Sequence, residues 1–260
     1  MLLVMDVGNT NTSLGVFKER ELRAQWRLST NREQTADEYG ILIRNLFHLE
    51  GLESKEITGI MIASVVPPLD GLLEDMAEKY FRLKAVFLGP GTRTGMAIRY
   101  DNPQEVGADR IADSMAAFEK YGGPCIVVDF GTAITFDAVS DKGEYLGGVI
   151  APGIGISSEA LFARAARLPR VEIREPARVI GTNTVASIQS GLFYGFVGLV
   201  EGLLDRMCRV MGPKTHVIAT GGQAEFLASA LKHKPPVDPF LTLEGLRIIY
   251  ERNHSTPRRK

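Results

Sequence analysis

The sequence contains two copies of one short pattern, an apolar run that ends in Asp-x-Gly and continues into a second β-rich run. In the first copy, Leu2–Met5 leads into Asp6-Val7-Gly8-Asn9-Thr10. In the second copy, Cys125–Val128 leads into Asp129-Phe130-Gly131-Thr132-Ala133. The two aspartates are 123 residues apart (129 minus 6), about the length of one domain. The repetition therefore predicts a duplicated fold, with a strand, a tight turn and a second strand in each half.

Helical and extended patterns alternate between these two copies. Thr35-Ala36-Asp37-Glu38 has the spacing of a capping box and predicts a helix that begins near Ala36. Residues 57–66 are rich in β-branched side chains and predict a strand, whereas residues 70–81 and 107–120 have helical patterns. This alternation predicts an α/β fold with a mostly parallel or mixed sheet. A break at Gly122-Gly123-Pro124 divides the chain into predicted domains over residues 1–121 and 122–260.

Composition excludes several classes of partner. The formal net charge is -1, so no summed positive field attracts a polyanion, and we expect no nucleic acid partner. The only cysteines are Cys125 and Cys208, which favours a reducing compartment but leaves one internal bridge open. The most apolar segment, residues 185–204, contains Gln189 and Glu201, so we interpret it as a buried helix rather than a membrane span. These features predict a cytoplasmic protein without a membrane partner.

The two Asp-x-Gly turns have the composition of phosphate-binding loops. Glycine lets backbone N–H groups approach phosphate oxygens, and short hydroxyl and amide side chains add hydrogen bonds. A carboxylate at the strand end, Asp6 or Asp129, can hold a cation against a triphosphate. One copy alone is better explained as a hairpin turn, but two copies favour nucleotide binding. The candidate residues are Gly8, Asn9, Thr10, Asn11 and Thr12 in the first turn, and Gly131 and Thr132 in the second.

A third glycine turn, Thr220-Gly221-Gly222, follows the predicted strand His216–Ala219. Its glycines would let the backbone lie against the base and ribose of a nucleotide. Other nucleotide signatures are missing. The chain has no Gly-x4-Gly-Lys-Ser/Thr loop, and Gly89-x-Gly91 lacks the downstream glycine of a dinucleotide-binding fold. The sequence therefore excludes the P-loop and Rossmann interpretations.

Residues 100–110 point to the chemistry of a phosphate acceptor site. Gly107-Ala108-Asp109-Arg110 places a carboxylate beside a guanidinium group at the predicted start of a helix. Asp109 could accept a proton from a substrate hydroxyl, and Arg110 could bind a carboxylate or phosphate with two hydrogen bonds. On spacing alone, a carboxylate stabilised by the helix dipole beside a solvated arginine explains this pair better.

Four motifs of the sequence together resemble the motif set of type III pantothenate kinases, which belong to the actin-like ATPase and sugar-kinase superfamily. They occur in the family's order, and the resemblance covers nearly the whole chain, including Gly147–Gly153. The resemblance implies a duplicated ribonuclease-H-like fold, with two domains and the nucleotide between them. The four motifs are Asp6-x-Gly8-Asn9-Thr10, Gly107-Ala108-Asp109-Arg110, Asp129-x-Gly131-Thr132-Ala133 and Gly181-Thr182-Asn183-Thr184.

The resemblance also implies a reaction, which is ATP-dependent phosphorylation of pantothenate to 4'-phosphopantothenate, the first step of coenzyme A biosynthesis. The implied cofactors are ATP with Mg²⁺ and a monovalent cation, K⁺ or NH₄⁺. Asp109 would accept the proton, Asp129 would hold the monovalent cation, and Thr184 would reach the substrate from the partner subunit of a homodimer. Gly221 and Gly222 would form the adenosine-binding turn. The implied pantothenate site consists of Tyr100, Gly107, Ala108, Asp109, Arg110 and Thr184.

Two alternative functions remain open from the sequence. One is a related small-molecule kinase that keeps the ATP turns but uses another hydroxyl acceptor. The other is a non-catalytic regulator that binds nucleotide, because actin-like folds often switch rather than catalyse. A panel of acceptors would separate the first alternative, and the presence of Asp109 argues against the second.

A glycine pattern in the predicted helix over 185–204 suggests a packing surface. Gly191, Gly195, Gly198 and Gly202 follow one another at steps of four, three and four, which places them on one face of a helix. Another backbone could pack closely on that face. The sequence leaves open whether this contact is made across a homodimer or within one subunit.

Overall fold

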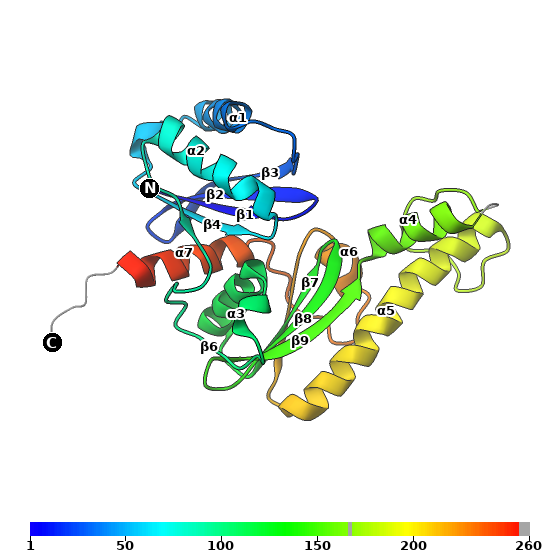
Figure 1. Cartoon of the computed structure of the whole chain (residues 1–260). Coiled ribbons are helices and arrows are strands. Elements are labelled where there is room, and N and C mark those ends of the chain that lie inside the picture. The colour runs from blue at the N-terminus through cyan, green and yellow to red at the C-terminus, as the bar shows by residue number, and fades with distance from the viewer. Residues whose placement is uncertain (166–167, 255–260) are drawn as a thin grey trace. The chain divides into compact units, whose positions relative to one another are not determined.

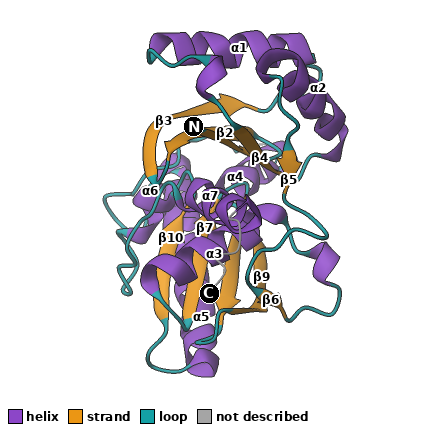
Figure 2. Cartoon of the chain, turned by 90° about the vertical axis from the view of Figure 1, so that its left-hand side faces the viewer, coloured by secondary structure: helices purple, strands orange, loops and turns teal. Residues whose placement is uncertain are grey.

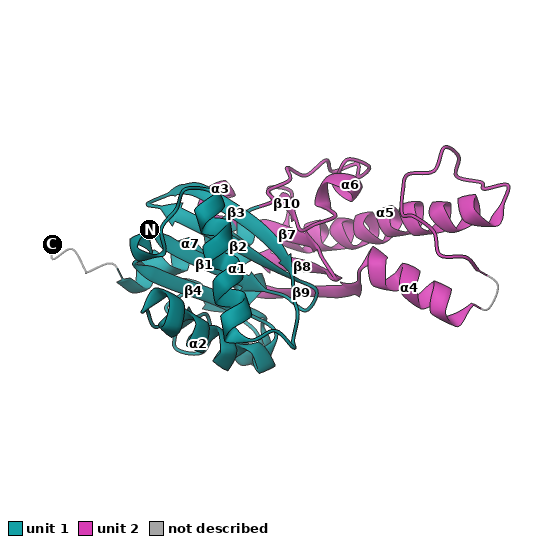
Figure 3. Ribbon diagram, turned by 90° about the horizontal axis from the view of Figure 1, so that it is seen from above, with its two compact units in different colours: residues 1–116, 240–260 teal, residues 117–239 magenta. Residues whose placement is uncertain are grey.

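The computed structural model describes residues 1–165 and 168–254. The chain forms two compact units (Figure 3). Unit 1 contains Met1–Ala116 and Phe240–Lys260, and unit 2 contains Ala117–Pro239. Unit 1 is discontinuous in sequence because the chain returns to it after unit 2. The domain boundary between residues 121 and 122 stays a prediction. That prediction assigned no C-terminal segment to the first domain.

The sheet of unit 1 is built from five strands. They are Leu2–Val7 (β1), Asn11–Lys18 (β2), Glu21–Ser29 (β3), Gly59–Ser64 (β4) and Val86–Phe87 (β5). Their order across the sheet is β3-β2-β1-β4-β5. β1 lies antiparallel to β2 and parallel to β4, and Asp6 pairs with Ser13 and Ala63 on these neighbours. The first Asp-x-Gly turn therefore begins at the end of a central strand.

Helices cover both faces of this sheet. The helices with residues in unit 1 are Ala36–Leu49 (α1), Asp70–Phe81 (α2), Ala108–Tyr121 (α3), which crosses the boundary at Ala116, and Leu241–His254 (α7). Figure 2 shows α1 and α2 together on one side of the sheet, where they bury one apolar cluster with β1, β2 and β4. α7 contacts β1, β2 and β4 as well. Each face of β1 is therefore buried, which explains its almost unbroken apolar sequence.

Alternation along β1 assigns its side chains to the two faces. Leu3, Met5 and Val7 belong to the cluster with α1 and α2, whereas Leu2 and Val4 are buried outside that cluster. The start of α1 matches the predicted capping box, because Thr35 accepts from the backbone N–H of Glu38 and the Glu38 side chain accepts from Thr35. The remaining short elements of unit 1 are Ser54–Glu56 (η1), Pro67–Leu69 (η2), Ala97–Ile98 (β6) and Pro103–Glu105 (η3).

Unit 2 repeats the strand plan of unit 1. Its strands are Cys125–Phe130 (β7), Ala133–Val139 (β8), Glu144–Pro152 (β9) and His216–Thr220 (β10), and they lie in the order β10-β7-β8-β9. β7 is antiparallel to β8 and parallel to β10, as β1 is to β2 and β4. In both units an antiparallel three-stranded ribbon is joined by a parallel strand beside its first strand. The predicted duplicated α/β architecture is confirmed by this shared strand order.

Three helices complete unit 2, and they are Ile154–Arg164 (α4), Thr184–Met211 (α5) and Ala224–Ala228 (α6). α4 lies beside the N-terminal part of α5 (Figure 1). The core of this unit joins apolar residues of β7 and β8 to one face of α5 and to α6. Cys125 and Cys208 are both free thiols, so the internal bridge that the sequence left open is not formed. Burial raises the pKa of the Cys125 thiol to about 12, which makes this thiol unreactive.

α5 is long and apolar enough, by length and composition, to cross a bilayer, as core helices of soluble proteins also can be. Its apolar face is buried in the core of unit 2 through Phe193, Phe196 and Val200. The polar side chain of Gln189 is satisfied inside the unit, because Nε2 donates to the carbonyl of Glu172 at 2.9 Å. These contacts support the interpretation of this segment as a core helix. The opposite face carries the exposed glycines Gly191, Gly195 and Gly198.

Candidate active site

The first Asp-x-Gly turn connects β1 to β2 in unit 1. The backbone N–H of Gly8 donates to the carbonyl of Asn11 at 3.0 Å and closes the turn. A Cβ atom at Gly8 would lie only 3.0 Å from that carbonyl oxygen, so the tight closure favours glycine. Asn9 and Thr10 at the tip are exposed, whereas Thr12 is fully buried. The turn thus presents short polar groups to solvent from a rigid base, which suits a phosphate group.

The segment after β3 supports this turn from one side. Thr30 donates through Oγ1 to the carbonyl of Gly8 at 2.7 Å, and its backbone N–H donates to the carbonyl of Thr10 at 2.9 Å. The hydroxyls of Thr12 and Thr30 are 2.9 Å apart and hydrogen-bonded. Two residues further on, Nη2 of Arg32 donates to Oδ1 of Asn9 at 2.7 Å. The first turn is therefore fixed by a segment that the sequence did not associate with it.

The second Asp-x-Gly turn connects β7 to β8 in unit 2 and has the same form. The backbone N–H of Gly131 donates to the carbonyl of Ala133 at 3.1 Å. The backbone N–H of Gly153, which precedes α4, donates to the carbonyl of Thr132 at 3.0 Å. A Cβ atom at Gly153 would overlap the carbonyl of Thr132 and lie 2.6 Å from that of Gly131, so glycine is required there. The start of α4 thus holds the second turn in place.

The third glycine turn lies directly against Asp129. β10 pairs in parallel with β7 so that Thr220 is opposite Asp129. Gly221 has a φ of +94°, and a Cβ atom there would overlap Oδ1 of Asp129. The backbone N–H of Gln223 donates to the carbonyl of Phe130 at 3.1 Å, which fixes the turn on β7. The structure therefore brings together Asp129, Gly131 and Gly221, which lie far apart in the sequence.

Asp109 lies in the first turn of α3 and is partly buried. Its Oδ1 accepts a hydrogen bond from the backbone N–H of Arg110 at 2.8 Å. Burial raises the pKa of Asp109 above its ordinary value of 3.8, and the amide and the charge of Arg110 oppose this rise. A Cβ atom at Gly107 would lie 2.5 Å from Oδ1, so this glycine leaves room for the carboxylate. A partly buried carboxylate of raised pKa is a suitable general base.

Other residues of the predicted acceptor site lie on the same stretch of unit 1. Arg110 is buried, with only 7% of its surface exposed. A buried guanidinium has lost much of its hydration, so it interacts strongly with a carboxylate that reaches it. Tyr100 is partly buried in the segment between β6 and η3, and Ala108 is the first residue of α3. Arg110 and Tyr100 therefore lie in the same unit as Asp109.

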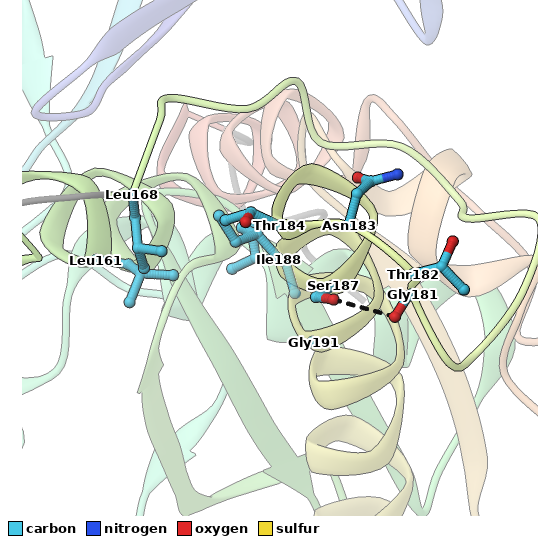
Figure 4. A pocket seen from close by; sticks show the side chains of 10 residues that line it. Leu161, Leu168, Gly181, Thr182, Asn183, Thr184, Ser187, Ile188 and Gly191 are labelled. Carbon is cyan, nitrogen blue, oxygen red and sulfur yellow. Dashed lines mark hydrogen bonds between the residues drawn. The ribbon is translucent and has the colours of Figure 1, made fainter.

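Thr184 belongs to unit 2, where it is the first residue of α5. Asn183 caps this helix, because its Oδ1 accepts from the backbone N–H of Ala186 at 2.9 Å. Residues 181–184 line a cavity of about 730 Å³ between this helix end, the preceding loop and α4 (Figure 4). Its apolar lining residues are Leu161, Leu168, Ile188 and Leu192. Thr184 therefore lines a cavity that the described residues of one subunit do not fill.

Cation binding at the glycine turns depends on the carboxylates beside them. Among residues 1–165 and 168–254, no three or more His, Cys, Asp and Glu side chains gather as a metal cluster. Mg²⁺ usually takes one or two protein carboxylates and completes its shell with phosphates and water. Asp6 and Asp129 each lie beside a glycine turn of phosphate-binding form. This donor set fits cations that share their ligands with a bound triphosphate.

Three contributors to the candidate site were missed by sequence reasoning. Thr30 and Arg32 follow a strand that was not predicted, and Gly153 precedes an unpredicted helix. The sequence indicates Gly147–Gly153 only as part of the family resemblance. The link between β2 and β3 has two residues, a length typical of a β-hairpin. A hairpin at this link would have predicted that the chain returns to the first turn and brings Thr30 and Arg32 to it.

Comparisons with known proteins identify the family. The type III pantothenate kinase family model matches residues 2–206. The chain is 58% identical to the type III pantothenate kinase of Koribacter versatilis (strain Ellin345) over 270 aligned residues, which cover 100% of this chain and 98% of that protein.

Solved structures of lower similarity share the fold. A structure described as a Baf family transcriptional activator from Campylobacter jejuni has a TM-score of 0.62 at 23% identity and covers 96% of this chain and 98% of its own. The inorganic polyphosphate/ATP-glucomannokinase from Arthrobacter sp. strain KM has a TM-score of 0.50 at 13% identity and covers 97% of this chain and 99% of its own. At identities below 25%, these structures support only the fold, which is the duplicated fold of actin-like ATPases and sugar kinases. Because the family model and the relative of 58% identity extend over most of the sequence, the chain belongs to the type III pantothenate kinase family.

Proposed function

We propose that the chain transfers the γ-phosphoryl group of ATP to the primary hydroxyl of pantothenate, with Asp109 as the proton acceptor. The observation that carries the proposal is the state of Asp109 in a chain of this family. Its carboxylate is partly buried, fixed by the Arg110 amide, and has a raised pKa. A base of raised pKa accepts a hydroxyl proton more readily, while positioning supplies most of the rate of phosphoryl transfer.

Oδ1 of Asp109 is engaged by the Arg110 amide, so Oδ2 accepts the hydroxyl proton of pantothenate. The pantothenate oxygen forms a bond to the γ-phosphorus while the bond from that phosphorus to the β–γ bridging oxygen breaks. The products are 4'-phosphopantothenate and ADP. Tyr100, Gly107 and Ala108 would line the pantothenate site, and the buried guanidinium of Arg110 would bind the pantothenate carboxylate with two hydrogen bonds.

Each glycine turn would contribute groups for ATP from its own unit. The first turn, with Gly8, Asn9, Thr10, Asn11 and Thr12, would donate to the phosphates, as would Gly131 and Thr132 in the second turn. Gly221 and Gly222 would lie against the adenosine. Asp6 would hold Mg²⁺ through its water shell, and Asp129 would hold K⁺ or NH₄⁺. When bound, these cations neutralise negative charge on the triphosphate.

The test of this function is direct identification of the product. The purified chain is incubated with Mg²⁺, ATP and pantothenate, with and without K⁺ or NH₄⁺, and 4'-phosphopantothenate is measured by mass spectrometry. We expect product that requires pantothenate and is stimulated by the monovalent cation. Asp129→Asn should weaken the stimulation. ATP hydrolysis without phosphorylated pantothenate would contradict the proposal, and a panel of other hydroxyl acceptors would then identify the substrate.

We further propose that the enzyme is a cytoplasmic homodimer that uses the exposed glycine face of α5. Nothing among the described residues lies within 4 Å of a Cβ atom placed at Gly191, Gly195 or Gly198. The alternative of close packing within one subunit therefore lacks support at these three positions. Exposed apolar residues lie near the N-terminal end of α5. They are Leu161, Phe162, Val179, Ile180 and Val185. A partner subunit would cover them and leave Thr184 next to the partner's substrate.

Gly195→Leu is expected to convert the dimer to a monomer. In a two-fold interface the substitution occurs twice, and each leucine would separate backbones that glycine lets approach. We expect dimer affinity to fall by about 100-fold or more. Sedimentation velocity would measure it. Gly71→Leu is the matched control, because Gly71 is also a helical glycine with open space around it, but lies on α2. An unchanged dimer in Gly195→Leu, or a monomeric wild type, would overturn this assembly.

A further inference from the structure

We infer that Arg32 is a positioning residue of the ATP site, which orients Asn9 toward the nucleotide phosphates and adds positive charge to the first turn. The observation is the hydrogen bond of 2.7 Å from Nη2 of Arg32 to Oδ1 of Asn9. The inference rests on the proposed function, because it assigns the first turn to the phosphates of ATP. It adds a residue outside the motifs that the sequence singled out.

The backbone around Arg32 holds it at the edge of the turn. Thr30 is tied to the first turn through its backbone N–H and its hydroxyl, at 2.9 and 2.7 Å. Asn31 then accepts from the backbone N–H of Glu33 at 3.0 Å through its side chain, which fixes a tight turn around residue 32. The guanidinium is therefore delivered to Asn9 by an anchored segment rather than by a free loop.

The chemistry of the two side chains determines the orientation of the Asn9 amide. A guanidinium only donates hydrogen bonds, so Asn9 must turn its oxygen toward Arg32. The NH₂ group of Asn9 then points away from Arg32 and can donate to another acceptor. A phosphate oxygen only accepts hydrogen bonds at neutral pH, so the exposed amide is presented with the correct polarity for a phosphate.

Among the residues that the structure describes, no carboxylate forms an ion pair with Arg32 that would cancel its charge. Arg32 is exposed, and among residues 1–165 and 168–254 its polar contact is the one to Asn9. Residues 8–12 of the turn carry no charged side chain, and Asp6 just before them is acidic. A bound triphosphate would bring several negative charges to this turn. The guanidinium therefore supplies the nearby positive charge that the motif itself lacks.

The test compares Arg32→Ala, Asn9→Ala and the double variant in the full-length enzyme. ATP affinity is measured by equilibrium titration, and KM values for ATP and for pantothenate are measured separately. We expect Arg32→Ala to raise the Kd and KM for ATP by about 10-fold to 100-fold and to leave the pantothenate KM unchanged. The double variant should lose less ATP affinity than the product of the two single losses, because part of the effect of Arg32 acts through Asn9. Arg32→Lys should recover part of the loss, since it keeps the charge but offers one ammonium group.

Arg23→Ala is the matched control, because Arg23 is an exposed arginine of β3 whose ion pair is with Glu21, at 3.7 Å. Arg23→Ala should leave the Kd and KM for ATP and the KM for pantothenate unchanged. The thermal midpoint of Arg32→Ala should equal that of the wild type. An unchanged ATP affinity in Arg32→Ala would overturn the inference, as would effects of the two single variants that multiply independently. Failure of the proposed function is distinguishable. A wild type that makes no 4'-phosphopantothenate but binds ATP in an Arg32-dependent manner would reject the reaction and keep the positioning role.

Discussion

Asp109→Asn should lower kcat for 4'-phosphopantothenate formation by about 10²-fold to 10⁴-fold, the usual contribution of a positioned general base. The substitution keeps the size of the side chain, and the amide oxygen can still accept from the backbone N–H of Arg110. ATP affinity should therefore be unchanged, because the nucleotide turns are built from other residues. A single-turnover measurement of product, combined with an ATP titration, separates the chemical step from binding.

The same substitution should not destabilise the protein at neutral pH. Burial raises the pKa of Asp109 in the folded state above its ordinary value of 3.8. The folded state therefore binds this proton more tightly than the unfolded state, and the stability it contributes is lost as pH rises through the folded pKa. At pH 7 the buried charge costs stability, which asparagine removes. We expect a free energy of unfolding equal to or above that of the wild type.

The pH dependence of activity follows from the same shift. The base must be ionised, so kcat/KM should fall as pH decreases through the raised pKa of Asp109. This acidic limb should be absent from the residual activity of Asp109→Asn. Asp75→Asn is the control, because it neutralises an exposed carboxylate on α2 of the same unit. Full activity in Asp109→Asn would show that another group accepts the proton and would contradict the proposed mechanism.

Local patterns in the sequence predicted the elements that carry the glycine turns. The two Asp-x-Gly repeats correspond to β1–β2 and β7–β8, and the capping box at Thr35 marks the start of α1. These signals depend on neighbouring residues, so they can be recognised without knowledge of the fold. The strand predicted over 57–66 is shorter in the structure, where it spans Gly59–Ser64. Element boundaries of this kind depend on packing as well as on propensity.

Contacts between distant segments could not be predicted in the same way. α7 returns to the sheet of unit 1, and a Cβ atom at Gly245 would overlap the carbonyl of Ala112 in α3. The position of Arg32 beside Asn9 depends on the antiparallel return of β3 along β2. Both contacts are set by strand order and helix packing, which hydrophobic period alone does not specify. The roles of the site residues themselves remain predictions that the proposed variants test.

Gly221→Ala should abolish most nucleotide binding, because the added methyl group would overlap Asp129 and Phe130 of the second turn. The Cβ atom would overlap Oδ1 of Asp129 and lie 2.6 Å from the backbone nitrogen of Phe130. Backbone atoms of β7 cannot move aside without disturbing the strand, so the glycine turn and Asp129 must separate. A displacement of about 1 Å at such a site can cost 10²-fold in activity, and we expect ATP affinity to fall by at least about that factor.

The substitution also strains the backbone, and a second glycine separates the two effects. Gly221 has a φ of +94°, and Gly212 at the end of α5 has a φ of +98° with nothing within 4 Å of its Cβ position. Gly212→Ala therefore carries the strain of a positive φ without the overlap, and should cost about 1–3 kcal/mol of unfolding free energy. It should leave ATP affinity unchanged, whereas Gly221→Ala should lose stability and affinity together. Urea unfolding and ATP titration of both variants decide the matter. Equal losses of ATP affinity would trace the effect to general strain in unit 2, and normal ATP binding by Gly221→Ala would remove the third turn from the nucleotide site.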